Sequence, residues 1–285
     1  MFVVIGYIMM CACIFGAYAA HGGELGVLWQ PAEFSIIFGG ASGAMIVAFG
    51  GIPLKSTLRS VPKVFKGNPY GKAFYLDLFA LLYEILSKVR KEGLMSIEGD
   101  VETPDASPLF SKYPQIARDH HVIEFLCDYL RLMVGGNLNA FEIENLMDVE
   151  IDTHHHESEV PSGVIATMAD SLPAFGIVAA VMGVVHTMGS LNLPPTELGK
   201  LIGAALVGTF LGILLGYGFV GPLARILATK ADEGTKVLQT IKVTLLASLN
   251  GYAPQVAVEF GRKAMESHMR PGFLELEEHV KNKKA

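Results

Sequence analysis

The sequence predicts an all-α fold: a polytopic membrane protein with four transmembrane helices and a helical cytoplasmic domain. Three observations lead to this prediction. Hydrophobic residues make up 51% of the 285 residues and charged residues only 18%, whereas soluble domains carry about 25% charged residues. Four apolar windows approach the roughly 20 residues that a membrane-crossing helix needs. The polar segments repeat apolar residues at helical spacing, and strand signals are weak.

The four predicted spans form two hairpins, at about residues 2–20 and 34–52 and at about residues 171–190 and 201–224. The first window ends in small residues like a signal peptide, but it lacks a basic start and its apolar core is long, so we predict a retained span. The connecting stretches "HGGELGVLWQPA" and "LNLPPTELG" contain no Lys or Arg, whereas the segment after the second span is rich in both. The positive-inside rule therefore predicts that both termini are cytoplasmic.

These spans divide the chain into four predicted parts. They are a first transmembrane hairpin at residues 1–52, a cytoplasmic helical domain at 53–169, a second hairpin at 170–228 and a cytoplasmic helical tail at 229–285. The stretch "YLDLFALLYEILSKVR" in the central domain repeats apolar residues every three or four positions, as an amphipathic helix does.

Composition and motifs argue against several other classes of protein. The net charge of -6 disfavours nucleic acid as a partner, because phosphate binding needs a basic face. Three cysteines are too few for a disulfide framework, and we interpret them as reduced apolar fillers. The sequence has no Walker lysine or nucleophile elbow, so we predict neither an enzyme nor a cofactor. The histidines of "THHHES" lack a defined spacing to other ligands, and we predict no metal site.

Small residues recur on the third and fourth spans. The fourth span carries one every four residues, and the third carries a similar face; the residues are Ala204, Gly208, Gly212 and Gly216, and Gly176, Ala180 and Gly183. Because lipid gives helices no hydrophobic reason to associate, such stripes let two backbones approach closely. Such stripes are common in membrane bundles, where plain helix packing explains them more often than a functional role does.

Two prolines lie near the cytoplasmic ends of these spans. Pro173 and Pro222 each remove a backbone donor and can loosen the adjacent turn. Pro173 also fits an ordinary first-turn proline after Asp170 and Ser171. That alternative does not suit Pro222, which lies deep in an apolar run.

The only hydroxyl at the middle depth of this hairpin is that of Thr209, which lies at nearly the same depth as Ala180. A lone threonine in a membrane helix usually bonds back to a carbonyl of its own helix, and the alternative is that it lines a path. No acidic residue lies in the core of any span. Ion transport normally needs a titratable group within the membrane, so a conducting complex would take its carboxylate from a second chain.

Several stretches resemble hallmark segments of the MotA family, the A subunits of the bacterial flagellar motor stator. They are "DSLPAFGIVAAVMGVVHTMGS", "LVGTFLGILLGYGFVGPLA", "VTLLASLNGYAPQVAVEFGRK", "QPAEFSIIFGGA" and "ALLYEILSKVRKEGLMSIEGDVE". The resemblance runs essentially from end to end and includes the four-span layout.

The resemblance implies a bacterial inner-membrane complex in which five A chains surround two MotB chains. MotB supplies the proton-binding aspartate and a peptidoglycan anchor, and ion flow moves the A ring against the rotor protein FliG. The family's conformational-coupling prolines match Pro173 and Pro222. Its rotor-facing charged pair matches Arg90 and Glu98, which would otherwise be interpreted as solvated surface residues.

The resemblance also bears on the transported ion. Sodium-type relatives carry threonines at the positions of Ala180 and Gly208, beside the one that matches Thr209, and this chain keeps only Thr209. A sodium ion needs oxygens to replace its hydration shell, whereas a proton moves through water, so we predict H+. Three alternatives are a sodium-coupled stator, a three-span energising subunit like ExbB or TolQ, and a membrane scaffold without ion flux.

Overall fold

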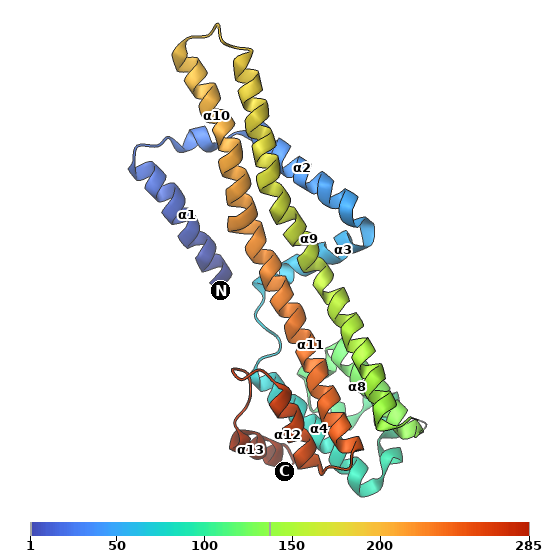
Figure 1. The fold of residues 1–285 in the computed structure, drawn as a ribbon. Helices are drawn as coiled ribbons and strands as arrows, with labels where there is room; N and C mark the ends of the chain where they lie inside the picture. The colour runs from blue at the N-terminus through green and yellow to red at the C-terminus, as the bar shows by residue number, and fades with distance from the viewer. Residues whose placement is uncertain (1, 137, 285) are drawn as a thin grey trace. The chain divides into compact units, whose positions relative to one another are not determined.

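The computed structural model describes residues 2–136 and 138–284, and within them every regular element is a helix (Figure 1). The predicted all-α fold is confirmed, as are four helical segments long and apolar enough to cross a membrane. The elements are α1 (Phe2–Ala20), η1 (Leu25–Leu28), α2 (Pro31–Phe49), α3 (Gly51–Ser60), η2 (Val61–Phe65), α4 (Lys72–Glu92), η3 (Leu94–Ile97), α5 (Glu98–Glu102), η4 (Pro104–Ala106), α6 (Pro108–Ser111), α7 (Pro114–Ala117), α8 (His120–Gly135), α9 (Ala140–Met188), α10 (Pro195–Ile213), η5 (Leu214–Val220), α11 (Gly221–Leu249), α12 (Pro254–Ala264) and α13 (Phe273–Lys284).

The chain forms two compact units, each built from two stretches of sequence. The first, which we call the membrane unit, comprises residues 1–67 and 158–229; the second, the polar unit, comprises residues 68–157 and 230–285. This division differs from the one predicted from hydropathy. The C-terminal tail joins the central segment because α12 and α13 both pack on α4.

Two helices are much longer than the spans predicted within them. The third span is the C-terminal part of α9, a helix of 49 residues, and the fourth continues through η5 into α11. Hydropathy finds the apolar part of such a helix but gives no signal where the helix continues into polar residues. In contrast, α2 and α10 begin at Pro31 and Pro195, in the first helical turn, where a proline costs no backbone hydrogen bond.

In the membrane unit, α2 packs against α9. Ile37 and Ala41 of α2 form a buried cluster with Leu172 and Ala179 of α9. The absence of a side chain at Gly40 is needed there, because its Cβ position is occupied by the ring of Phe175. The contact therefore depends on one glycine facing one aromatic ring.

The polar unit has a conventional hydrophobic core centred on α4 and α8. Nine residues of α4 are buried, in line with the predicted amphipathic pattern. Cys127 lies in this core, and burial raises the pKa of its thiol to about 11, so it is an unreactive apolar filler as predicted. The hydroxyls of the buried residues Tyr113 and Tyr129 donate to Glu84 and Glu150 at 2.9 and 2.7 Å.

Candidate functional site

The backbones of α9 and α10 are in direct contact along the line where the two helices meet, which we call the seam. A Cβ atom on Gly176 would lie 2.9 Å from the carbonyl oxygen of Gly208 and 3.0 Å from Cα of Gly212. One on Gly183 would lie 2.7 Å from Cβ of Ala205. Most residues of the predicted stripes therefore face the other helix, but Ala205 rather than the predicted Ala204 lies opposite Gly183. The helices approach closely because no large side chain separates them.

On the N-terminal side of the third span, the seam reaches the first of the two prolines. Pro173 lies inside α9, which continues unbroken through it, so Pro173 is not the first-turn proline that the sequence also allowed. Because proline has no N–H, the carbonyl of Ala169 loses its helical donor. A Cβ atom on Gly216 would lie 2.6 Å from that carbonyl oxygen and 2.8 Å from Cδ of Pro173. Gly216 thus packs directly on the backbone that the proline leaves open.

Residues Leu214–Val220 form a π-helix of seven residues, η5. The N–H of Gly221 donates to the carbonyl of Gly216, five residues earlier. Pro222 follows at once, and in a regular α-helix its ring would clash with the carbonyl of Gly218. The wider π turn relieves that clash, and such turns are frequent at functional sites. The sequence predicted a loosened turn near Pro222 but not a change of helix type.

Two of the three residues predicted for the ion pathway, Gly208 and Ala180, meet on the seam. A Cβ atom on Gly208 would lie 3.2 Å from the backbone nitrogen of Ala180, and Thr209 follows Gly208 in α10. Thr187 and Thr167 of α9 donate to carbonyls of their own helix at 2.9 and 3.0 Å. Across residues 2–136 and 138–284, by contrast, the partly exposed Thr209 has no hydrogen bond from its hydroxyl. That hydroxyl is therefore available to water, an ion or another chain.

Next to this seam the two helices present an apolar surface. On α9, Ile177, Val181 and Val185 are exposed at four-residue spacing, and on α10 Leu206 is 62% exposed. No acidic residue occurs in the four predicted span cores. Glu33, just outside one of them, has one buried carboxylate oxygen without a hydrogen bond. The seam supplies a hydroxyl and apolar side chains but no carboxylate.

The predicted rotor-facing pair lies in the polar unit on two neighbouring elements. Arg90 is exposed in the last turn of α4, and Glu98 is exposed as the first residue of α5. Between these elements Lys88 donates to Asp100 at 2.8 Å, and Ser107 donates to the other oxygen of the same carboxylate at 2.6 Å. Sequence reasoning missed Asp100. Its bond with Lys88 connects α4, which carries Arg90, to α5, which carries Glu98.

Burial alone raises the pKa of Asp100, but the hydrogen bonds from Lys88 and Ser107 outweigh burial and lower the pKa below its ordinary value. A carboxylate with a depressed pKa stabilises the fold above its unfolded pKa of about 3.9, and this contribution is lost as the pH falls through the folded pKa. Asp100→Asn is therefore expected to cost about 1–2 kcal/mol at pH 7. The difference from the unaltered chain should vanish under acid conditions. Thermal unfolding of the purified full chain from pH 7 downward measures both effects.

Asp105→Asn, at an exposed aspartate in the same region, is the matched control and should leave the unfolding temperature unchanged. An equal loss of stability in both variants, or a loss in Asp100→Asn that persists at low pH, would contradict the role of the ionised carboxylate.

Comparison with known proteins identifies the family. Residues 4–93 match the family model described as motility protein A N-terminal, and residues 118–240 match the MotA/TolQ/ExbB proton channel family. The chain is 53% identical over 281 residues to motility protein A of Salmonella typhimurium, covering 99% of this chain and 95% of the relative. The chain belongs to the motility protein A family. Motility protein A of Escherichia coli matches equally, with 53% identity over 281 residues and the same coverage of both chains.

Solved structures of the same family share the fold. The structure of C. jejuni MotAB matches with a TM-score of 0.77 at 18% identity, covering 93% of this chain and 95% of that one. The flagellar MotAB stator complex from Bacillus subtilis matches with a TM-score of 0.71 at 24% identity, covering 90% and 92%. The 53% identity to motility protein A confirms the predicted resemblance to the MotA family, and the solved structures confirm the fold. The N-terminal motility protein A match excludes the alternative of a three-span ExbB- or TolQ-like subunit. A chain of this family with four apolar spans is a multi-pass inner-membrane protein.

Proposed function

We propose that this chain is the ion-conducting A subunit of a flagellar stator. With MotB it forms a proton channel whose flux drives a ring of A subunits against the rotor protein FliG. MotB contributes the proton-binding aspartate and the peptidoglycan anchor. Five A chains surround two MotB chains, with both termini of each A chain in the cytoplasm. The observation that carries the proposal is the α9–α10 seam, which offers an unbonded hydroxyl at Thr209 but no carboxylate.

A carboxylate without a proton is costly in lipid, and it becomes much less costly when protonated. Proton binding to the MotB aspartate therefore changes which surface of the seam it favours. Thr209 is placed to organise the water through which the proton arrives. Because Ala180 and Gly208 add no side-chain oxygen, the site lacks the oxygens that would replace the hydration shell of sodium.

The proposed ion is tested by collapsing the two gradients separately. A strain without its own stator is supplied with this chain and MotB, and swimming speed is recorded. A protonophore is expected to stop swimming, and removal of the sodium gradient is expected to leave the speed unchanged. A speed that followed sodium alone would overturn the assignment of H+.

Replacing the hydroxyl of Thr209 should slow conduction without disturbing the helix. Thr209→Val keeps the shape of the side chain, and Thr209 bonds to no carbonyl of its own helix in the described structure. Thr209→Val removes one hydrogen bond to the water that carries the proton. Such a bond contributes about 1.4 kcal/mol, and its loss corresponds to a roughly tenfold slower transfer step. Proton uptake by vesicles that hold the complex measures this rate. The control is Thr187→Val, which removes a hydroxyl bonded within α9 and should leave uptake within twofold of the unaltered complex.

A further inference from the structure

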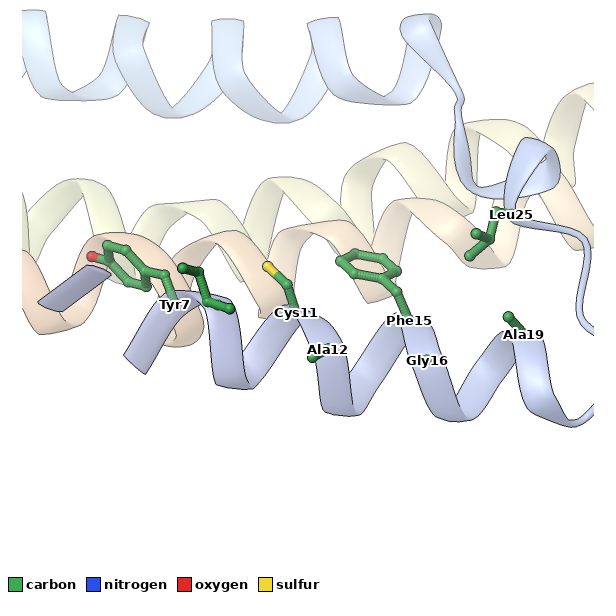
Figure 2. Close-up of a pocket in the computed structure, with 8 residues that line it drawn as sticks. Tyr7, Cys11, Ala12, Phe15, Gly16, Ala19 and Leu25 are labelled. Carbon is green, nitrogen blue, oxygen red and sulfur yellow. The ribbon is translucent and has the colours of Figure 1, made fainter. Parts of the chain in front are cut away.

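The π-helical segment η5 is held on one side by α1, the first span. The hydroxyl of Tyr7 donates to the carbonyl oxygen of Phe219 at 2.8 Å. The rings of Tyr7 and Phe219 stack with centroids 5.1 Å apart and planes 29° apart. Figure 2 shows the Tyr7 ring near the N-terminal end of α1, directed toward the neighbouring helix. One side chain thus contacts both the backbone and the ring of the same residue in the π turn.

A second residue of α1 packs on the same segment. The sulfur of Met10 lies 2.9 Å from the Cβ position of Gly218, so the thioether fills the space that a side chain would need there. Cys11 and Phe15 of α1, which line a pocket together with Tyr7, carry a thiol and an aromatic ring (Figure 2). A polar group among apolar side chains in a membrane span is satisfied by a partner within the protein, and for the Tyr7 hydroxyl that partner is the carbonyl of Phe219.

The opposite side of η5 packs on the third span. Gly216 lies against the carbonyl of Ala169 and the ring of Pro173, as described above. The segment therefore contacts Tyr7 and Met10 of α1 as well as Ala169 and Pro173 of α9. Pro222 lies two residues beyond the end of the segment at Val220. A π turn differs from an α turn by one residue in its hydrogen-bond pattern, so a change between the two shifts everything beyond it.

We propose that Tyr7 is a positioning residue of the ion-driven movement, acting by fixing the π-helical form of η5 through the carbonyl of Phe219. The role rests on the proposed stator function. Tyr7 does not touch the ion path; it sets the backbone geometry of the cytoplasmic end of the fourth span. Without its hydroxyl the π and α forms of η5 interconvert more freely, and proton passage moves the helix beyond Pro222 less effectively.

Tyr7→Phe tests the hydroxyl alone, because the ring stacking on Phe219 is kept. Tyr18→Phe is the matched control: Tyr18 lies on the same helix, and its ring packs beside Gly23. Both variants are expressed with MotB, and their copurification measures assembly. We expect Tyr7→Phe to assemble normally, to take up protons within twofold of the unaltered complex, and to swim at half the speed or less. Tyr18→Phe should match the unaltered complex in all three measurements.

A spectroscopic readout separates positioning from a general loss of stability. In complexes labelled with 13C at phenylalanine carbonyls, loss of the bond to Phe219 is expected to shift one amide I component to higher frequency in Tyr7→Phe. Tyr18→Phe adds the same extra labelled phenylalanine to α1 and therefore cancels its contribution. Equal speeds in the two variants, or a shifted band without a loss of speed, would overturn the proposal. If the unaltered chain failed to restore swimming at all, the stator function itself would fail instead.

Discussion

Replacing Gly212 with leucine is expected to abolish swimming. A Cβ atom at this position would lie 2.7 Å from the carbonyl oxygen of Leu172 and 2.8 Å from Cα of Gly176. Both atoms belong to backbone, which cannot rotate away as a side chain can. The helices must therefore separate, and the seam that brings Gly208 next to Ala180 opens with them. Interhelix contacts in lipid depend on this close packing, because no hydrophobic force replaces it.

The same substitution at Gly203 is the control for Gly212→Leu. Gly203 lies on α10 as well, but among the described residues no atom of another element lies within 4 Å of its Cβ position. Both variants receive an equally large side chain in an equally apolar helix, so insertion into the membrane should be the same. We expect Gly203→Leu to swim and Gly212→Leu to remain in the membrane without supporting motility. Normal swimming of Gly212→Leu would show that the seam is not needed.

The parts of this fold that are predictable from sequence are those with a strong local pattern. The four spans follow from their apolar length, and α4 from its repeating apolar positions. The spacing of Gly208, Gly212 and Gly216 correctly indicated a stripe of small residues, because a four-residue period returns to one side of a helix. The partner of the stripe followed from the matching residues on the third span.

Other features depend on contacts that no local pattern shows. The tail was predicted as a separate segment, yet α12 and α13 pack on α4. This packing joins residues that are far apart in the sequence, so no local pattern shows it. The residues alone favoured a bond from the Thr209 hydroxyl to its own helix, because the sequence does not show which rotamer the side chain adopts. Asp100 looked like one of many surface acids, since its partners Lys88 and Ser107 lie twelve and seven residues away.

The second large effect concerns Pro222. Pro222→Ala restores a backbone N–H and removes the ring, so the reason for the π turn at Leu214–Val220 disappears. An α-helix then becomes the more stable form of this segment. Its hydrogen-bond pattern shifts by one residue, so the residues beyond the segment turn about the helix axis relative to Gly216 and Pro173. We expect the variant to assemble with MotB but to swim at less than a tenth of the normal speed. Hydrogen exchange of the purified complex should show stronger protection of residues 214–220.

Pro195→Ala separates this effect from the mere removal of a proline. Pro195 lies in the first turn of α10, where its missing N–H has no helical partner to lose. Alanine there should therefore leave both exchange and swimming unchanged. A Pro222→Ala variant with stronger protection and normal speed would show that the π turn is only an accommodation of the proline ring. Loss of speed together with increased protection instead links torque to the form of the helix itself, because the substitution adds a backbone hydrogen bond to the segment.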